Sequence, residues 1–509
     1  MGTRHLTRRL FLAASVLAAP IVRASADSCS DKPLRIRVRR NFQTFDPADA
    51  WGDDAVVARN ILAPLVRYKR ANANSDWEWQ KHLVTSITEQ DHRTIPFDLR
   101  SETWGGSDDI TADDVAFSFE RIAGLTKPQI PSANRIVWSK LDKVESRSSR
   151  SAIIRLKQDE PDFILNNLAS VAGCVVNKKQ VDAMSGGGFK LDPGRTSGRY
   201  RICSLSSNDR VLLGKEDNWK GDPVAISAAL FIVIVDDDAA QAAWRAGEID
   251  VYEASRDVLD RVPANLQRDR GRAYRASTSR VVYLGMTSNG ALRNPALRRA
   301  VQIGVNPAEV GRIAYGSADT RLATGLVPQG WIGWSREPRY RYQPDEAQRL
   351  TGQAGAAVQL RMLFPPDPVL TRVAFAVQTA LAQVGMRVDL VSMPNYVETL
   401  ERLSVGAADL AVFMGPPPSL NPSSVFNRFG SKQGLAFYAN ADYDTLLSRS
   451  AAQNDRAEAL QSLNNKLIDD GAVAPLVEDH SLWLVGSDFT PAFGPDGDVG
   501  DLGEWTTLG

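Results

Sequence analysis

Residues that commonly carry catalysis or bind metals are few and scattered in this sequence. The chain has four histidines (His5, His82, His92 and His480) and three cysteines, and no pair of them has the spacing of a zinc or iron–sulfur site. The motifs G-x-S-x-G, H-E-x-x-H, G-x-G-x-x-G and G-x-x-x-x-G-K-[ST] are all missing. The sequence therefore predicts no cofactor, no metal centre and no catalytic residue. The alternative is an exported hydrolase acting on a saccharide or peptide, because the 60 acidic residues could include a catalytic carboxylate pair.

The charge balance argues against nucleic acid as a partner. Lys+Arg and Asp+Glu both number 60, whereas binding to a polyanion favours clustered basic residues. One acidic cluster, Asp236-Asp237-Asp238, could bind a hard cation such as Ca²⁺. Its position before an alanine-rich segment favours capping of a helix instead.

The first 26 residues have the order of an export signal. Basic residues come first, an apolar stretch from Leu10 to Val22 follows, and Ala24-Ser25-Ala26 ends it as an A-x-A cleavage site. The apolar stretch is shorter than the roughly 20 residues that a membrane-spanning helix needs. Arg8-Arg9 followed by Leu10-Phe11-Leu12 favours the twin-arginine route over the general secretion route. Cleavage removes four arginines and no acids, so the mature chain is mildly acidic.

The cysteines allow two states in an oxidising compartment. Cys174 and Cys203 could form a disulfide and leave Cys29 free, or all three thiols could stay unpaired.

Strands and helices alternate through the body of the chain. The apolar run Ser227–Val235 predicts a buried strand, and the Asp236–Asp238 triplet caps a short helix that ends at Gly247. Asn294-Pro295 and Asn306-Pro307 each predict the start of a helix. Further strands are predicted at 96–100, 358–364, 387–391 and 409–414, and further helices begin after Thr111, after Pro344 and near Val369. This alternation favours an α/β fold with a parallel or mixed sheet, and 509 residues favour two or three domains.

Several short segments carry a family resemblance through their order and spacing. They include Thr44-Phe-Asp-Pro-Ala48, Phe97-Asp-Leu-Arg100 followed by Thr111-Ala-Asp-Asp-Val-Ala-Phe-Ser118, and Ala242-Ala-Trp-Arg-Ala-Gly-Glu-Ile-Asp250. Further segments are Thr196–Tyr200, Asn218–Pro223, Asn294–Ala300, Val384–Val388 and Ala441–Leu447. In this order they resemble the extracytoplasmic solute-binding proteins of the peptide/nickel class, family 5, of ABC importers, and the resemblance runs through nearly the whole mature chain.

This resemblance implies a two-lobed periplasmic-binding-protein fold with mixed sheets and an extra α+β domain inserted near the N-terminus. Lobe I would comprise 27–55, 186–278 and 478–509, the inserted domain 56–185, and lobe II 279–477. The implied protein is a monomer in the periplasm that captures a small peptide-like or other organic solute between its lobes. It would deliver that solute to an ABC permease at the inner membrane.

The same resemblance suggests which side chains face the ligand. Trp51 follows the first motif, where lobe I of such proteins approaches the ligand, and Trp331 and Trp334 lie in a loop near the lobe junction. Phe413 and Met414 end a predicted strand, where α/β folds commonly place ligands. Packing in the core or at the surface is the alternative for each of these residues.

One segment departs from the family pattern in a way that bears on the ligand. Peptide-binding members hold the ligand's ammonium with an aspartate in a segment Trp-x-x-Asp-Tyr-x-Asp-Pro, and here the matching position is Pro418. We therefore expect either a ligand without a free ammonium or recognition of the amine by an acid elsewhere. Ser419 and Asn421 would then supply neutral hydrogen bonds, unless this loop only shapes the rim of the site.

Overall fold

The computed structural model describes Cys29 and residues 31–508, except for 73–74, 185–186, 255–269, 317–319, 356, 416–421, 432–436 and 451–454. The predicted export signal, Ser419 and Asn421 lie outside the described residues. None of the helices in the described parts of the chain combines the length and the apolar character that crossing a bilayer requires.

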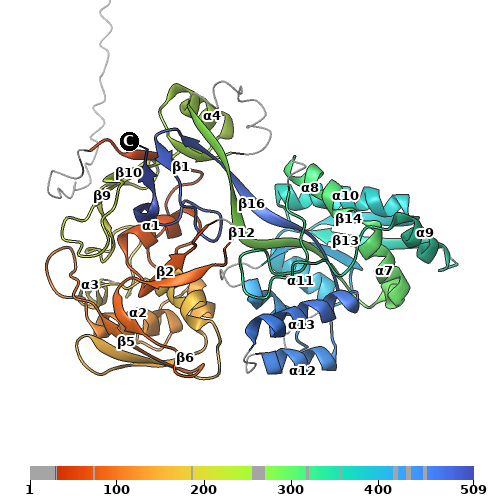
Figure 1. Ribbon diagram of the computed structural model, residues 1–509, viewed down its shortest axis with the longest axis horizontal. Coiled ribbons are helices and arrows are strands. Elements are labelled where there is room, and N and C mark those ends of the chain that lie inside the picture. Colours follow the sequence, from red (N-terminus) through yellow and green to blue (C-terminus); the bar gives the residue numbers. More distant parts are fainter. Residues whose placement is uncertain are drawn as a thin grey trace, which may run out of the picture.

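A ten-stranded mixed sheet runs through the molecule (Figure 1). Its strand order is β14-β13-β15-β12-β16-β11-β1-β10-β9-β8. Parallel pairs occur near both ends of this order, and the central pair β12·β16 is antiparallel. The strands are β1 Leu34–Val38, β8 Tyr200–Ser206, β9 Arg210–Lys215, β10 Ala228–Val233, β11 Val251–Glu253, β12 Gly271–Met286, β13 Val358–Phe364, β14 Met386–Ser392, β15 Leu410–Gly415 and β16 Val473–Gly486.

The two longest strands, β12 and β16, join two bodies of the molecule. Figure 1 shows them passing from the left body, which contains β1 and β8–β11, to the right body, which contains β13–β15. Their pairing runs from Gly271↔Gly486 to Gly285↔Val473, and its register shifts between Ser277 and Val281. A register shift of this kind bends the strands locally, so the bridge is irregular near its middle.

The left body holds a second, smaller sheet in addition to its part of the large one. This antiparallel sheet has the order β4-β5-β7-β6 and packs against helix α2 (Ala112–Ala123), whose Phe119 stacks on Trp138 at 4.1 Å between ring centroids. Its strands are β4 Val84–Ile87, β5 Thr94–Leu99, β6 Leu141–Ser146 and β7 Ser151–Leu156. The hairpin of β2 (Val66–Lys69) and β3 (Glu78–Lys81) and the helices α1 (Asp53–Ile61), α3 (Lys178–Ala183) and α4 (Asp237–Ala246) complete this body, and β17 (Phe489–Thr490) pairs with β18 (Thr506–Thr507) near the C-terminus.

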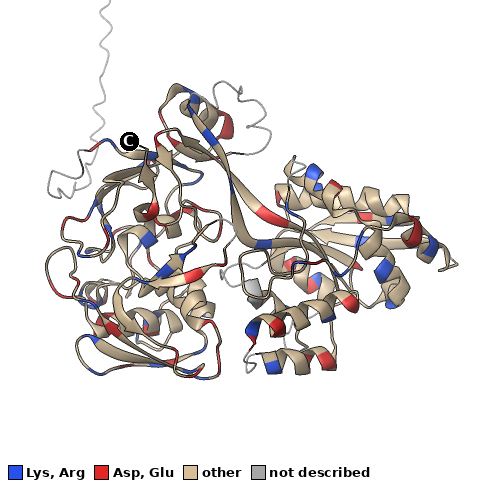
Figure 2. Cartoon of the chain, in the orientation of Figure 1, with Lys and Arg blue, Asp and Glu red and all other residues tan. Residues whose placement is uncertain are grey.

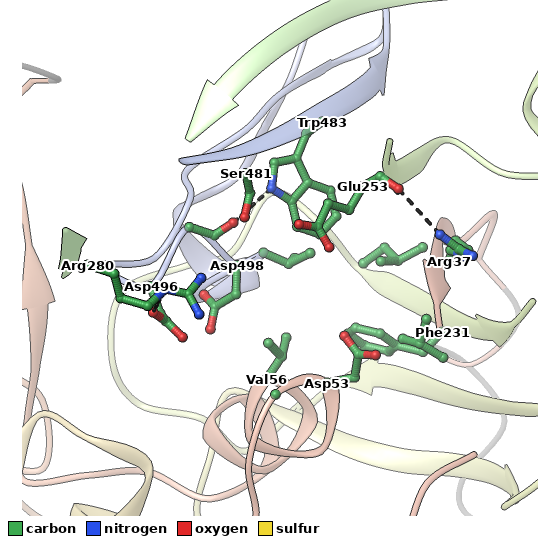
Figure 3. Close-up of a pocket in the computed structure, with 15 residues that line it drawn as sticks. Arg37, Asp53, Val56, Phe231, Glu253, Arg280, Ser481, Trp483, Asp496 and Asp498 are labelled. Carbon is green, nitrogen blue, oxygen red and sulfur yellow. Dashed lines mark hydrogen bonds and ion pairs between the residues drawn. The ribbon is translucent and has the colours of Figure 1, made fainter. Parts of the chain in front are cut away.

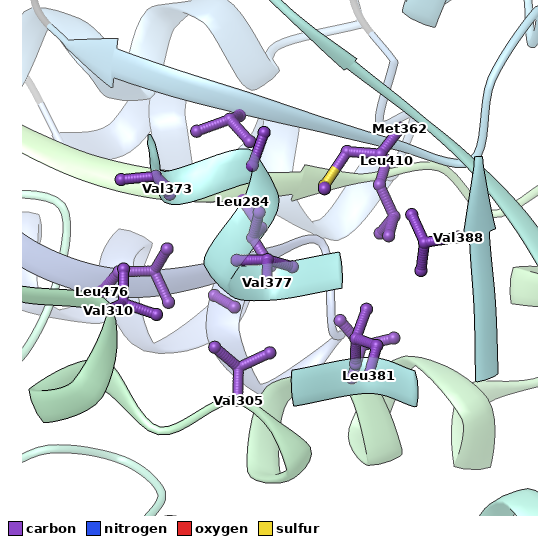
Figure 4. Close-up of a cluster of buried hydrophobic side chains, with 14 of the residues drawn as sticks. Leu284, Val305, Val310, Met362, Val373, Val377, Leu381, Val388, Leu410 and Leu476 are labelled. Carbon is purple, nitrogen blue, oxygen red and sulfur yellow. The ribbon is translucent and has the colours of Figure 1, made fainter. Parts of the chain in front are cut away.

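In the right body, helices cover the β13–β15 part of the sheet. Aliphatic side chains of α7, α8 and α10 meet those of β12–β16 in one buried cluster (Figure 4). A second cluster packs α11 and α13 against the sheet. The helices of this body are α7 Pro295–Gly304, α8 Pro307–Tyr315, α9 Pro344–Gly352, α10 Pro368–Gln383, α11 Tyr396–Ser404, α12 Ala441–Ser450 and α13 Arg456–Asp469.

The predicted helix starts are confirmed with their capping contacts. Asp236 caps α4 by accepting a hydrogen bond from the backbone N–H of Ala239 at 2.7 Å, and Thr111 forms a capping box with Asp114 at the start of α2. Asn294 and Asn306 accept backbone hydrogen bonds at the starts of α7 and α8, each followed by proline. Local signals were sufficient here because a cap involves only neighbouring residues.

The cysteine prediction was wrong. Cys29 and Cys203 form the disulfide, with 5.9 Å between their Cα atoms, and Cys174 is the free cysteine among the described residues. Cys174 is fully buried beside α1, where burial raises the pKa of its thiol to about 12. Cys203 instead lies on β8, the edge strand of the large sheet. Which thiol reaches Cys203 depends on the order of the strands, and the spacing of the cysteines does not reveal that order.

Candidate functional site

The middle of the β12·β16 bridge carries a group of buried polar side chains. Asp479 of β16 is 6% exposed and accepts hydrogen bonds from Tyr315 at 2.8 Å and from Thr278 at 3.1 Å. Arg280 of β12 forms an ion pair with the same carboxylate at 3.0 Å. Burial alone would lower the pKa of Arg280, but the carboxylates of Asp479 and Asp496 outweigh it and raise this pKa, so the guanidinium stays charged.

A cavity of about 150 Å³ lies beside this part of the bridge (Figure 3). It is bounded by β1, the start of α1, the end of β11, β16 and the turn at 496–499. Its apolar lining belongs to the core of the left body and consists of Ile36, Val38, Val56, Phe231, Trp483 and Val499. Its charged lining consists of Arg37, Asp53, Glu253, Arg280, Asp496 and Asp498.

Two acids of this cavity have raised pKa values. Burial raises the pKa of Asp496 to about 6, and nearby Arg280 only partly offsets that effect. Burial likewise raises the pKa of Asp53, although the backbone N–H of Arg39 donates to its carboxylate at 3.2 Å. Three carboxylates of the lining have a guanidinium partner: Asp496 lies 3.8 Å from Arg280, Glu253 lies 3.7 Å from Arg39, and Asp498 pairs with Arg59. In the part of the chain that the structure describes, no group of three or more His, Cys, Asp or Glu side chains is arranged to hold a metal ion.

A second meeting point joins the two bodies directly, away from the bridge. The backbone N–H of Trp77 donates to the carbonyl of Gly330 at 2.7 Å, and the ring of Trp77 lies 6.4 Å from that of Trp331. Tyr68 contacts both rings, at 6.2 and 6.5 Å between centroids. Arg456 of α13 also pairs with Asp162 of the left body at 3.2 Å. We call the aromatic group of Tyr68, Trp77 and Trp331, together with the Arg456–Asp162 ion pair, the inter-body contact.

The predicted site residues fall into separate environments. Trp51 is 64% exposed, with the Arg40 guanidinium 3.4 Å from its ring centroid, and it directly precedes Gly52 and Asp53 of the cavity. Trp331 is 3% exposed within the inter-body contact, and Trp334 is partly buried in the same core cluster. The indole nitrogens of Trp331 and Trp334 are buried without a hydrogen-bond partner in the structure.

The structure gives Phe413 a packing role instead of a place on an open surface. Its side chain is fully buried, stacks on Phe437 at 5.9 Å and lies 5.6 Å from Tyr283. Met414, the next residue of β15, packs partly buried against the other core cluster of the right body. Successive residues of a strand point to opposite faces, and both faces of β15 are covered here.

Sequence reasoning missed the charged residues of the bridge and the cavity. Arg280 and Asp479 come from strands separated by about 200 residues, and nothing local indicates that they pair. Asp496 lies in Pro495-Asp496-Gly497, which as a sequence indicates only a turn. Nothing in the sequence around Tyr68 and Trp77 indicates that they contact Trp331 of the right body.

Comparison with known proteins places this arrangement in a family. The model of the bacterial extracellular solute-binding proteins, family 5, matches residues 78–437, and the chain belongs to this family. Its members are solute-binding proteins, and the alternative of an exported hydrolase finds no support. The fold is the predicted α/β, two-lobed fold of periplasmic binding proteins.

Individual relatives are similar over most of their length. The oligopeptide-binding protein OppA of Mycobacterium bovis is 24% identical over 514 residues, covering 94% of this chain and 84% of the relative. The crystal structure of the ABC transporter substrate-binding protein CtaP of Listeria monocytogenes has a TM-score of 0.77 at 18% identity, covering 94% of this chain and 99% of that one. Haemophilus influenzae OppA in complex with the peptide RPPGFSPFR has a TM-score of 0.68 at 19% identity, covering 94% and 99%.

Proposed function

We propose that this protein is the periplasmic receptor of an ABC importer, which captures a small solute between its two bodies and presents the closed form to a membrane permease. The observation that carries the proposal is the match of the family 5 solute-binding model to residues 78–437, together with two bodies that the β12 and β16 strands join. Closure around a solute is a shift in population, so the solute must contact both bodies to favour the closed form.

We propose a division of this receptor into two lobes and an inserted domain. We assign 27–55, 186–278 and 478–509 to lobe I, 56–185 to the inserted domain and 279–477 to lobe II. The buried clusters support the separation of lobe II from the rest, because those of the left body draw on residues 34–276 and 483–505. The protein acts as a monomer and without catalysis.

The solute is peptide-like or another organic molecule of similar size. Relatives named as oligopeptide-binding proteins and the peptide complex of H. influenzae OppA support a peptide-like ligand. We propose Trp51, Trp331, Trp334 and Met414 as ligand contacts; Trp51 is already exposed, and Trp331 would become accessible when the bodies separate. Ser419 and Asn421, outside the described residues, would contribute neutral hydrogen bonds.

Residues 1–26 serve as a twin-arginine export signal in this proposal. Changing Arg8 and Arg9 to lysine preserves the charge but removes the arginine pair, so precursor should accumulate in the cytoplasm. Cell fractionation measures this directly. Unaltered secretion of the double variant would assign the general secretion route instead.

A screen followed by scattering tests the receptor function. Thermal-shift measurements with di- to pentapeptides, their N-acetyl forms, oligosaccharides and nickel chelates identify a stabilising solute. Small-angle scattering with that solute should then show a smaller radius of gyration, and mass spectrometry should recover the solute unchanged. Conversion of the solute by purified protein would establish an enzyme and overturn the proposal.

A further inference from the structure

The charged groups around the cavity are unequally paired. Four carboxylates and two guanidinium groups line it. Arg37 donates to Asp237 at 2.7 Å and to the carbonyls of Ile234, Val235 and Glu253, so its donors are directed to groups other than the cavity's carboxylates. Arg280 lies nearest to Asp479, which is not part of the lining. Each cation of the lining therefore has its shortest ion pair with an acid outside the lining, and Arg280 also lies 3.8 Å from Asp496 within it.

The carboxylates differ in how well the protein satisfies them. Asp498 forms an ion pair with Arg59 of α1, and Glu253 lies 3.7 Å from Arg39. Asp496 accepts no hydrogen bond from the described residues, and its closest cation is Arg280 at 3.8 Å. Its side chain nevertheless keeps 40% of its surface accessible at the cavity. Asp496 is therefore a carboxylate accessible from the cavity. Its closest cationic partner, Arg280, is shared with Asp479.

The shape and the apolar wall of the cavity restrict what can enter. Its volume of about 150 Å³ is below the roughly 300 to 1,000 Å³ of pockets that hold a whole small-molecule ligand. In Figure 3 the carboxylates of Asp53, Glu253 and Asp498 end around one open space, with Val56 and Phe231 on one side and Trp483 on the other. This space suits one charged group with a few carbon atoms, but it is too small for a whole peptide.

We propose that the cavity binds a positively charged group of the solute, a primary ammonium or a guanidinium, with Asp496 as its main partner and Glu253 and Asp53 beside it. The carbon atoms next to that group would pack on Val56, Phe231 and Trp483. This inference rests on the proposed receptor function and names its substrate class: solutes that carry a cationic group. It locates the recognition of an amine in the left body, at a distance in sequence from the loop that contains Pro418.

The protonation of Asp496 makes this recognition depend on pH. The charged groups that act on it are Arg280 of β12, Asp479 of β16, Asp498 of the same turn and Arg59 of α1. Because burial raises its pKa to about 6, Asp496 is largely protonated at pH 5 and ionised at pH 7. Affinity for a cationic solute should therefore rise from pH 5 to pH 7. A bound cation would in turn lower the pKa of Asp496.

Matched pairs of probes test the inference. Isothermal titration would use di- and tripeptides that contain arginine against the same peptides with citrulline, and lysine against Nε-acetyl-lysine. Nα-acetylated forms test whether an N-terminal ammonium is the group that binds. At pH 7 we expect at least one cationic member to bind ten-fold or more tightly than its neutral partner, and this ratio should shrink at pH 5.

Asp496→Asn should reduce the preference to less than three-fold and remove its dependence on pH. Asp488→Asn, an exposed aspartate of the same C-terminal segment, is the matched control and should keep the native preference. The melting temperature of Asp496→Asn at pH 7 should stay close to that of the native protein, because the side chain is 40% accessible and its ion pair with Arg280 is long, at 3.8 Å.

Three results would overturn the inference: equal binding of both members of every pair, a preference that survives in Asp496→Asn, or no binding of any cationic probe at millimolar concentration. Compaction in scattering separates the two proposals. If a neutral probe compacts the protein and binds as tightly as its cationic partner, the receptor function holds and the cationic site does not. If a probe binds but is chemically converted, the receptor function itself fails.

Discussion

The segment Thr44–Ala48 contains an aspartate, Asp46, that forms a buried ion pair. Asp46, in the segment Thr44–Ala48, receives two hydrogen bonds from Arg121 of α2, at 2.6 and 2.9 Å. The two residues are 3% and 1% exposed. Asp46 also accepts from the backbone N–H of Ala48 at 3.0 Å and of Phe189 at 3.3 Å, so one carboxylate ties three distant segments together.

Removing one member of this pair should be strongly destabilising. Asp46→Ala leaves the Arg121 guanidinium buried and unpaired, and we expect unfolding free energy to fall by about 3 to 5 kcal/mol. The double variant Asp46→Ala/Arg121→Met should lose less than the sum of the single variants, because no charge stays buried. Urea unfolding measures both. Arg312→Ala, which breaks an exposed pair with Glu309, is the control and should change stability by less than about 1 kcal/mol.

At the scale of elements, the helix starts show how far local chemistry specifies this fold. Asn306 precedes Pro307 and accepts a hydrogen bond from the backbone N–H of Ala308 at 3.1 Å. Asn306→Ala removes that acceptor and should cost about 1 kcal/mol, whereas Asn306→Asp should be close to neutral. Thermal or urea unfolding provides the measurement. Equal stability of the alanine variant would show that the cap contributes nothing here.

The disulfide on the edge strand β8 determines how many thiols react in the unfolded protein and contributes to stability. Cys29 and Cys203 are paired and Cys174 is buried, so unfolded, non-reduced protein should contain one reactive thiol per chain. Cys174→Ser should abolish that signal, and Cys203→Ser should raise it to two. Cys203→Ser should also lower stability by roughly 2 to 4 kcal/mol, because a cross-link over 174 residues restricts the unfolded chain. Retention of one thiol in Cys174→Ser would contradict the pairing.

The elements that the sequence predicts are specified by neighbouring residues, whereas those it misses depend on residues far apart in the chain. The run Val358–Phe364 was predicted as a strand and is β13, and the segment from Asp236 to Gly247 was predicted as a capped helix and is α4. The strands β12 and β16 were not predicted, because polar residues such as Thr278 and Asp479 interrupt their hydrophobic pattern. Those polar residues satisfy each other only after the two strands pair.

The candidate site was predictable only in part, for the same reason. Tryptophans could be singled out one at a time, and Trp331 does lie where the two bodies meet. The cavity depends on the convergence of β1, α1, β11, β16 and a C-terminal turn, which no segment encodes alone. Phe413 ends a predicted strand, but its surroundings come from distant segments, and in the structure it is buried against Phe437 and Tyr283.

At the scale of the whole molecule, charge is spread evenly while contacts between the bodies are concentrated. Figure 2 shows acidic and basic residues interspersed over both bodies and on the strands that join them. The bodies are linked through the β12·β16 bridge and through the inter-body contact around Trp77, Trp331 and the Asp162–Arg456 pair. The first link holds the bodies together in any arrangement. The second exists only when they are close, so it should add to the stability of the closed form.

Loss of the inter-body contact should therefore favour separation of the bodies. Asp162→Asn removes the charge that pairs with Arg456 while keeping a residue that tolerates the positive φ of 63° at this position. Trp77→Ala removes the aromatic contact with Trp331 and Tyr68. An aromatic pair is worth about 0.5 to 1.5 kcal/mol, so solute affinity should fall by roughly 2- to 12-fold in Trp77→Ala. The partly exposed ion pair should have a smaller effect.

Scattering from the unliganded variants distinguishes this role from direct contact with the solute. If Trp77 and Asp162 stabilise closure, both variants should have a larger radius of gyration without solute, and solute should restore compaction at higher concentration. A side chain that only touched the solute would change affinity and leave the unliganded protein as it was. Arg349→Gln, which breaks an exposed pair with Glu346 within α9, is the control and should match the native protein in both measurements. Native scattering and native affinity in Trp77→Ala and Asp162→Asn would mean that the bodies close without help from this contact.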